Sequence, residues 1–142
     1  MEKPEIKKLV LDFVKKRKFA VLSTVTPEGL PEAALIEFGE TDELELIFET
    51  MATYRKYTNL QLNNRVALVI GWEEAITVQY EGIAHELSGE ELKKYQQYFY
   101  KKNPRAERWE EHPGSRVFKV VPTWIKYGDF GVDPWQIHEI NL

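Results

Sequence analysis

Two adjacent cations, Arg55 and Lys56, stand where the sequence would favour a negative charge. They follow the strand-like run LELIFE and open a predicted helix over residues 54–62, for which Thr53 is a plausible N-cap. Unpaired N–H groups make a helix N-terminus partially positive, so acidic residues are preferred in its first turn. A bound phosphate would accept hydrogen bonds from these N–H groups, the guanidinium and the ammonium together. Thr50 and Thr53 are close enough in sequence to add hydroxyl donors.

A second interpretation of the same residues needs no ligand. Arg55 and Lys56 are then solvated and pair loosely with Glu49 or another surface carboxylate, which contributes little to stability. The residues alone leave both interpretations open.

Other chemistries find little support in the sequence. His85, His112 and His138 are too widely spaced to predict a metal site, and the absence of cysteine removes thiolate and disulfide chemistry. Ser23 and Ser115 lie in no nucleophile-elbow pattern, and the glycines form no phosphate-loop fingerprint. No residue stands out as a general acid or base.

Hydrophobic periodicity and turn residues predict the elements that must position Arg55 and Lys56. An amphipathic helix is expected over residues 6–14 and a second helix after Ser88, with Glu91 as capping-box partner and Pro104 as its stop. Residues 105–115 are expected to form a loop or ragged helix, and the tail from Gly131 is expected to be irregular. Strands are expected in a hairpin over 19–38 and at 44–49, 65–72, 75–87 and 116–130.

Two residues within these strands predict local irregularity, and one strand predicts the core. Gly82 is a candidate bulge or point of close approach, and Pro122 implies an edge position or a bulge. We expect the core strand to bury Val66, Leu68, Val69 and Ile70. About six strands joined mostly by turns predict an antiparallel barrel with helices packed outside, a mainly β (α+β) fold.

Composition indicates one ordinary globular domain over residues 1–142. Hydrophobic residues make up 43% and charged residues 30% of the chain. The net charge of −4, without a long basic run, argues against nucleic-acid binding. The chain has neither a run of roughly twenty apolar residues nor a signal-peptide core, so we expect a cytoplasmic protein that does not span a membrane.

Three segments together resemble the FMN-binding split-barrel superfamily that includes pyridoxamine 5′-phosphate oxidase. In order, they are FAVLSTVTPEGLPEAALIEF, LIFETMATYRKYTNLQLNNRVALVIGW and GIAHEL, with a weaker similarity in VVPTWIKYGDF. The central segment is the specific one: a strand ending in Thr, then Arg-Lys, a short helix with an Asn-rich exit, and a β-branched strand.

This resemblance implies a fold, a cofactor and a set of site residues. The fold would be a six-stranded antiparallel split β-barrel, usually a homodimer, with FMN in a cleft between subunits. Thr50, Arg55 and Lys56 match the residues that bind the FMN phosphate. Glu49 falls where the family lends main-chain contacts, and Thr77 falls where the oxidase has a ring-contacting Gln.

The resemblance also shows departures from the oxidase proper. The oxidase has an Arg near the position of Ala33-Ala34 and a phosphate-contacting Lys near that of Phe38-Gly39. Its C-terminal Arg-Leu-His segment, which helps to bind the vitamin B6 substrate, has no counterpart in WQIHEINL. We therefore expect an FMN-dependent oxidoreductase of unknown small substrate rather than a pyridoxamine phosphate oxidase. The alternatives are a non-catalytic flavin carrier, a relative that binds deazaflavin or haem, and an interaction module whose cleft stays empty.

Overall fold

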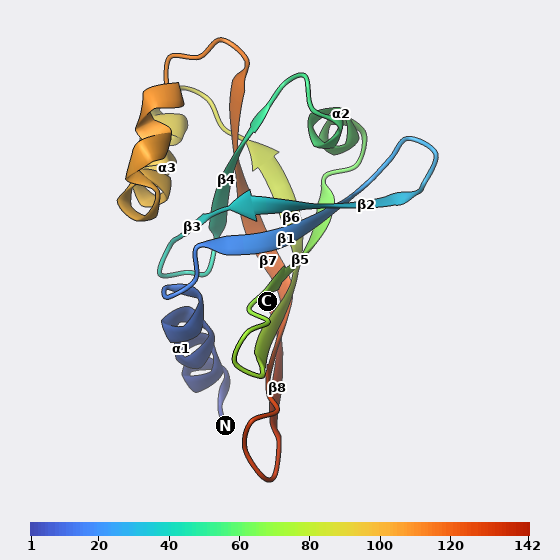
Figure 1. Ribbon diagram of the computed structural model, residues 1–142, viewed down its shortest axis with the longest axis vertical. Coiled ribbons are helices and arrows are strands. Elements are labelled where there is room, and N and C mark those ends of the chain that lie inside the picture. The colour runs from blue at the N-terminus through green and yellow to red at the C-terminus, as the bar shows by residue number, and fades with distance from the viewer.

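The computed structural model describes all 142 residues, which form a strongly curved sheet with helices around it (Figure 1). The helices are α1 (Lys3–Val14), α2 (Arg55–Leu62), α3 (Gly89–Lys102) and the 3₁₀ helix η1 (Pro104–Trp109). The strands are β1 (Phe19–Val25), β2 (Pro31–Glu37), β3 (Gly39–Glu40), β4 (Leu46–Met51), β5 (Arg65–Ile70), β6 (Ile76–Glu86), β7 (Ser115–Asp129) and β8 (Gln136–Asn141). None of the helices combines the length and apolarity needed to cross a membrane.

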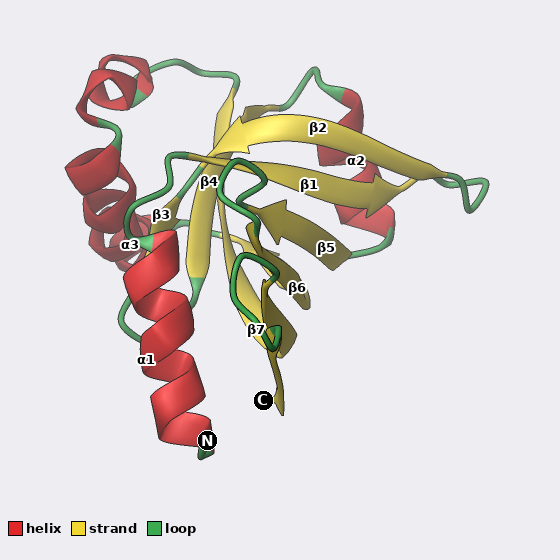
Figure 2. Cartoon of the chain, turned by 60° about the horizontal axis from the view of Figure 1, so that its bottom comes forward, coloured by secondary structure: helices red, strands yellow, loops and turns green.

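All of the strand pairs are antiparallel, and the sheet does not close on itself, because the strands at its two ends do not pair with each other. The strands lie in the order β2-β1-β5-β6-β7-β4-β3, with β8 paired to β7. Curvature brings β2, at one end of this order, near β4, but no backbone ladder joins the two. The sheet therefore forms a split barrel, and its opening lies between β2 and β4, with α2 beside it (Figure 2).

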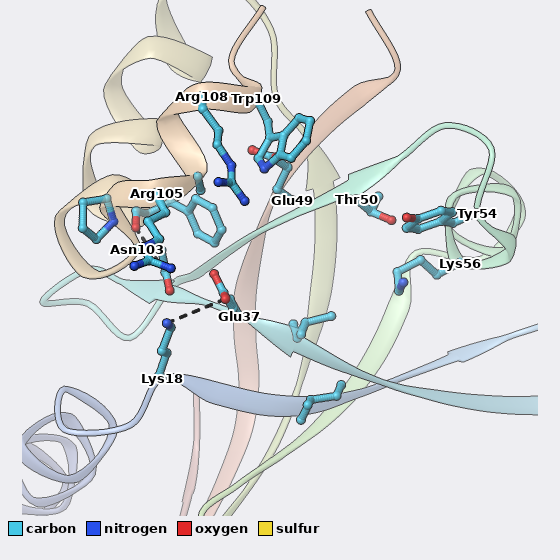
Figure 3. A pocket seen from close by; sticks show the side chains of 15 residues that line it. Lys18, Glu37, Glu49, Thr50, Tyr54, Lys56, Asn103, Arg105, Arg108 and Trp109 are labelled. Atoms are coloured by element: carbon cyan, nitrogen blue, oxygen red, sulfur yellow. Dashed lines mark hydrogen bonds and ion pairs between the residues drawn. The ribbon is translucent and has the colours of Figure 1, made fainter. Parts of the chain in front are cut away.

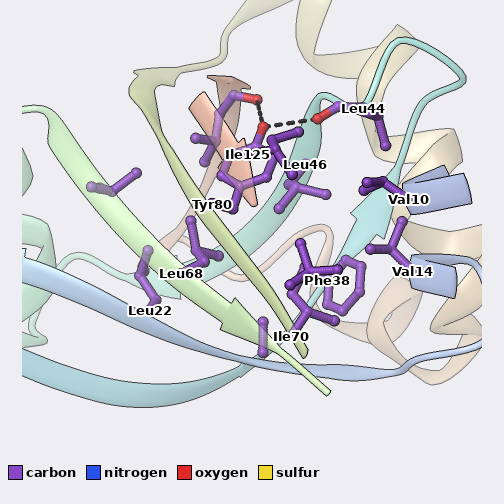
Figure 4. Close-up of a cluster of buried hydrophobic side chains, with 14 of the residues drawn as sticks. Val10, Val14, Leu22, Phe38, Leu44, Leu46, Leu68, Ile70, Tyr80 and Ile125 are labelled. Atoms are coloured by element: carbon purple, nitrogen blue, oxygen red, sulfur yellow. Dashed lines mark hydrogen bonds between the residues drawn. The ribbon is translucent and has the colours of Figure 1, made fainter. Parts of the chain in front are cut away.

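Alternate side chains of the strands fill the inside of this barrel. In β5, Val66, Leu68 and Ile70 are buried, as the sequence predicts, but Val69 is 39% exposed. The prediction for Val69 was wrong because strand side chains alternate, so Val69 projects from the outer face of the sheet. The amphipathic helix α1 adds Val10 and Val14 to the same core (Figure 4).

Strand β4 is buried on both of its faces. Leu46 and Phe48 face the barrel interior, while Ile47 packs with Tyr95, Phe99 and other residues beneath α3. Ile47 alternates with Leu46 and Phe48 and shares its face with Glu45 and Glu49, a pattern typical of an exposed face; nothing near it in sequence indicates that α3 covers it.

Two further predictions need correction, and two are confirmed. The sheet has eight strands rather than six, because β3 is very short and β8 forms in the tail expected to be irregular. Tyr54, not Thr53, occupies the N-cap position of α2 and makes no side-chain capping bond, so Arg55 and Lys56 are the first two residues of the helix. The pairing register shifts between Glu81 and Gly82, opposite Pro122, which confirms the predicted bulge. A 3₁₀ helix at η1 is consistent with the predicted ragged helix.

Candidate functional site

A large cavity lies at the opening of the barrel. It has a volume of about 710 Å³ and is lined on one wall by Leu35, Ile36 and Glu37 of β2. Glu49 and Thr50 line it from β4, which is the last strand but one at the other end of the strand order. Figure 3 shows residues near α2 on one side of the cavity and residues of η1 on the other.

The α2 side of the cavity brings Thr50, Tyr54 and Lys56 together. Thr50 is 4% exposed, and its buried hydroxyl oxygen has no hydrogen-bond partner. Lys56 forms no ion pair; its ammonium lies 5.2 Å from the centre of the Tyr54 ring. Burial lowers the pKa of Lys56, because removing water disfavours the charged form. An unpaired cation and an unpaired hydroxyl at one cavity wall are suited to holding an anion.

A second cavity, of about 410 Å³, adjoins the first and shares Tyr54 and Lys56 with it. Arg55 and Thr53 line this smaller cavity, together with Ala33 and Ala34 of β2. Lys56 therefore faces both spaces. Thr50 lines only the larger cavity and Arg55 only the smaller one, so Lys56 is the residue that joins them.

Arg55 has a partner within the chain that the sequence did not identify. It forms an ion pair with Glu32 of β2, and the Asn59 side chain donates a 2.7 Å hydrogen bond to the same carboxylate. The no-ligand interpretation expected a pair with Glu49 or another surface carboxylate, and the carboxylate that pairs with Arg55 is Glu32. Glu32 is distant in sequence and has no local pattern that marks it as a partner.

Glu49 reaches the cavity from the face of β4 that α3 and η1 cover. Its Oε2 atom is buried and has no hydrogen-bond partner. Burial raises the pKa of Glu49, Glu37 raises it further, and the neighbouring Ser115 lowers it by less than burial raises it. Burial, with Glu110, Glu49 and Glu107, also raises the pKa of Tyr100 to about 12. Glu49 therefore offers a side-chain carboxyl to the cavity, beyond the main-chain contacts implied by the resemblance.

The η1 side of the cavity contains residues that the sequence did not assign to the site. Arg105 and Arg108 line it, together with Trp109, and their spacing of three residues places them on one face of a 3₁₀ helix. Asn103 lies beneath them and is 2% exposed. Two arginines three residues apart could have suggested an anion site, but nothing in the sequence indicates that residue 105 lies close to residue 50.

Thr77, by contrast, lines neither cavity. It lies at the start of β6, where it pairs with Gly128. The helix α2 leads instead into Arg65, the first residue of β5, which pairs with Ile83 toward the other end of β6. One chain therefore does not bring Thr77 to Thr50, Arg55 and Lys56. None of the three histidines lines either cavity, and no cluster of potential metal ligands is present.

Comparisons with known proteins agree with this architecture. The heme binding protein from Mycobacterium smegmatis superposes with a TM-score of 0.85 at 16% identity, covering 99% of this chain and 60% of that one. General Stress Protein 26 from Bacillus anthracis superposes with a TM-score of 0.75 at 24% identity, covering 97% and 99%. At these identities the likeness concerns the fold alone.

Sequence relatives give a closer assignment. A pyridoxine/pyridoxamine 5′-phosphate oxidase of Rubrobacter xylanophilus is 38% identical over 76 residues, which are 53% of this chain and 35% of that protein. The match thus spans about a third of the length of this curated relative. The family model described as pyridoxamine 5′-phosphate oxidase matches residues 6–128, a range that includes every residue lining the two cavities. The chain belongs to the pyridoxamine 5′-phosphate oxidase family.

Proposed function

We propose that this protein binds FMN and acts as an FMN-dependent oxidoreductase on a small substrate. The observation that carries the proposal is the placement of Thr50, Arg55 and Lys56 around two adjoining cavities at the opening of the barrel. Membership of the pyridoxamine 5′-phosphate oxidase family supports a phosphorylated flavin as the ligand of these residues.

The residues present fit such a ligand. The smaller cavity has cations for a phosphate, and the larger one has the volume of typical cofactor pockets, about 300 to 1,000 Å³. The Thr50 hydroxyl, which is buried without a partner, would gain a hydrogen-bond acceptor. Leu35, which lines the larger cavity and is 61% exposed, offers an apolar surface for a flat ring.

In this proposal the bound flavin supplies hydride or electron transfer, and the protein supplies orientation and electrostatics. Arg55 and Lys56 would neutralise the phosphate in the smaller cavity, and Thr50 would add a hydroxyl donor from the adjoining larger cavity. Glu49, whose pKa is raised by burial, holds a proton at higher pH than an exposed glutamate does. Arg105 and Arg108 place positive charge at the η1 side of the larger cavity.

A homodimer is part of the proposal. The outer face of the sheet carries an apolar row across three strands, because Val21 pairs with Leu35 on one side and with Val69 on the other. Leu35 is 61% exposed and Val69 39% exposed. A second copy would cover this row, and a contribution of Thr77 to the cofactor would then come from the partner subunit.

Haem is the second candidate ligand, because a heme binding protein shares the fold at a TM-score of 0.85. Haem iron is commonly held by a histidine, but His85, His112 and His138 line neither cavity. A haem in the larger cavity would need a different ligand, such as Tyr54. The paired cations favour a phosphorylated flavin.

Titration of the protein with FMN tests the proposal. We expect saturable quenching of flavin fluorescence and a rise in melting temperature, since a ligand that binds only the folded state stabilises it. Arg55→Ala combined with Lys56→Ala should weaken FMN binding by about a hundredfold or more, the effect of losing charge-assisted hydrogen bonds.

The matched control removes two adjacent cations elsewhere. Lys93 and Lys94 are exposed on α3 and line neither cavity, so their replacement by alanine should leave FMN affinity unchanged. Absence of FMN binding to the wild-type protein would refute the proposal, and binding of haem with a Soret band would favour the second candidate. Oxidation of reduced nicotinamides by the FMN-loaded protein would separate an enzyme from a flavin carrier.

A further inference from the structure

The ion pair of Glu32 and Arg55 is anchored from the side of the carboxylate. Asn59 is 3% exposed and donates hydrogen bonds both to Glu32 and, over 3.0 Å, to the hydroxyl of Thr24. The Glu32 side chain is only 22% exposed, whereas the Arg55 side chain is 82% exposed. The buried amide therefore fixes the carboxylate, and the arginine is the exposed member of the pair, without a second side-chain partner.

This carboxylate lies in the wall of the same small cavity as Arg55 and Lys56. It offers two oxygens to a guanidinium, which is what a phosphate would offer at that place. A phosphate that enters the cavity must take Arg55 away from Glu32, and it then lies near a negative charge that Asn59 keeps in position. Both effects oppose binding of a dianion and leave binding of an uncharged ligand unaffected.

We propose that Glu32 is an intramolecular competitor for the phosphate site, so that it lowers the affinity of the protein for phosphorylated ligands relative to their uncharged counterparts. The proposal rests on the proposed function, in which a phosphate binds at Arg55 and Lys56. It identifies Glu32 as a residue that determines specificity in this chain.

A different role for Glu32 would be to position Arg55 for the phosphate. The contacts favour competition, because Asn59 holds Glu32 while the Arg55 side chain stays largely exposed. The two roles predict opposite results when the charge of Glu32 is removed.

The test compares FMN with riboflavin, which has the same ring and no phosphate. In Glu32→Gln, the remaining side-chain oxygen can still accept the hydrogen bond from Asn59, so the local structure is retained. We expect this variant to bind FMN about tenfold more tightly than wild type, from removal of one opposing charge at a partly exposed site. Riboflavin affinity should not change.

Glu28→Gln is the matched control, since Glu28 is exposed in the turn of the same hairpin and the substitution makes the same change in net charge. It should leave both affinities unchanged. Unchanged or weaker FMN binding by Glu32→Gln would overturn the proposal, and equal tightening of FMN and riboflavin would do the same.

Inorganic phosphate separates failure of this proposal from failure of the proposed function. If no variant binds FMN, nuclear magnetic resonance of wild type should still show the Arg55 Nε–H and the Glu32 carboxyl signals shifting with one phosphate midpoint. That midpoint should fall about tenfold in Glu32→Gln. A Glu32 signal that does not move while Arg55 binds phosphate would overturn the proposal, and this measurement on wild type does not depend on the folding of any variant.

Discussion

The hydroxyl of Tyr80 lies 2.8 Å from the carbonyl oxygen of Leu44 and 3.1 Å from that of Val120, deep inside the barrel (Figure 4). Its one proton is shared between two segments that are 76 residues apart in sequence, at positions 44 and 120. Leu44 has a positive φ of 64°, an unusual conformation for a leucine, and is 1% exposed. Tyr80 thus stabilises a strained turn directly before the strand that carries Glu49 and Thr50.

Replacement of Tyr80 by phenylalanine should lower the free energy of unfolding by about 1 to 3 kcal/mol, because two buried carbonyl groups lose their donor. Denaturant unfolding measures the change. Tyr98→Phe is the control, since Tyr98 is 38% exposed and should lose little stability. Equal stability of Tyr80→Phe and wild type would show that the bond contributes nothing.

Aspartate substitutions on adjacent residues of β5 should separate the core from the outer face. Leu68→Asp should prevent folding, because Leu68 is 2% exposed and an unpaired charge would be buried. Val69→Asp should remain folded, because Val69 projects outward, but it should convert the proposed dimer into a monomer. Circular dichroism and light scattering measure the two properties, and a Val69→Asp variant that is unfolded would contradict the placement of β5.

The raised pKa of Glu49 predicts a pH-dependent stability. The ordinary value is 4.5, and burial raises it in the folded protein, so the folded state binds more protons than the unfolded state above that value. The contribution of Glu49 to stability therefore falls as pH rises from about 4.5 through the folded pKa. Glu49→Gln should remove this decline and be more stable than wild type at pH 7, on the order of 1 kcal/mol or less.

Urea unfolding at a series of pH values measures this difference between wild type and Glu49→Gln. The two proteins should converge toward equal stability below the ordinary pKa of a glutamate, where the carboxyl is protonated in both states. A difference that is constant across this range would show that Glu49 titrates normally.

A methyl group at Gly82 should disrupt the bulge in the β6–β7 pairing. A Cβ atom there would lie 2.5 Å from the carbonyl oxygen of Val121, which is backbone and cannot move aside without shifting β7. Gly82→Ala should therefore lower the free energy of unfolding by about 1 to 3 kcal/mol. Gly131→Ala, whose Cβ would meet no atom closer than 3.4 Å, should change stability little.

The sequence predicts the elements that have strong local patterns. The helix α1 follows from its apolar stripe, and the bulge follows from Gly82 and Pro122. β8 was missed because its residues do not alternate clearly in polarity, and its pairing with β7 supplies the order. Whether such a segment forms a strand depends more on pairing with a distant segment than on its own residues.

The candidate site shows the same division. Arg55 and Lys56 are recognisable because their charge conflicts with a local feature, the helix N-terminus. Glu32 and the η1 arginines carry no such conflict, and only the tertiary fold places Glu32 at the smaller cavity and the arginines at the larger one. Residues that reach a site only through the tertiary fold cannot be recognised from patterns between near neighbours in the sequence.

Because no backbone ladder joins β2 and β4, a ligand bound in the opening would hold these two strands together. A molecule that contacts both strands cross-links the first and last parts of the sheet, which the backbone itself leaves unjoined. Ligand binding would then restrain β2, which pairs only with β1. The amide hydrogens of β2 should therefore slow their exchange with solvent more than those of β6, which pairs with a strand on each side.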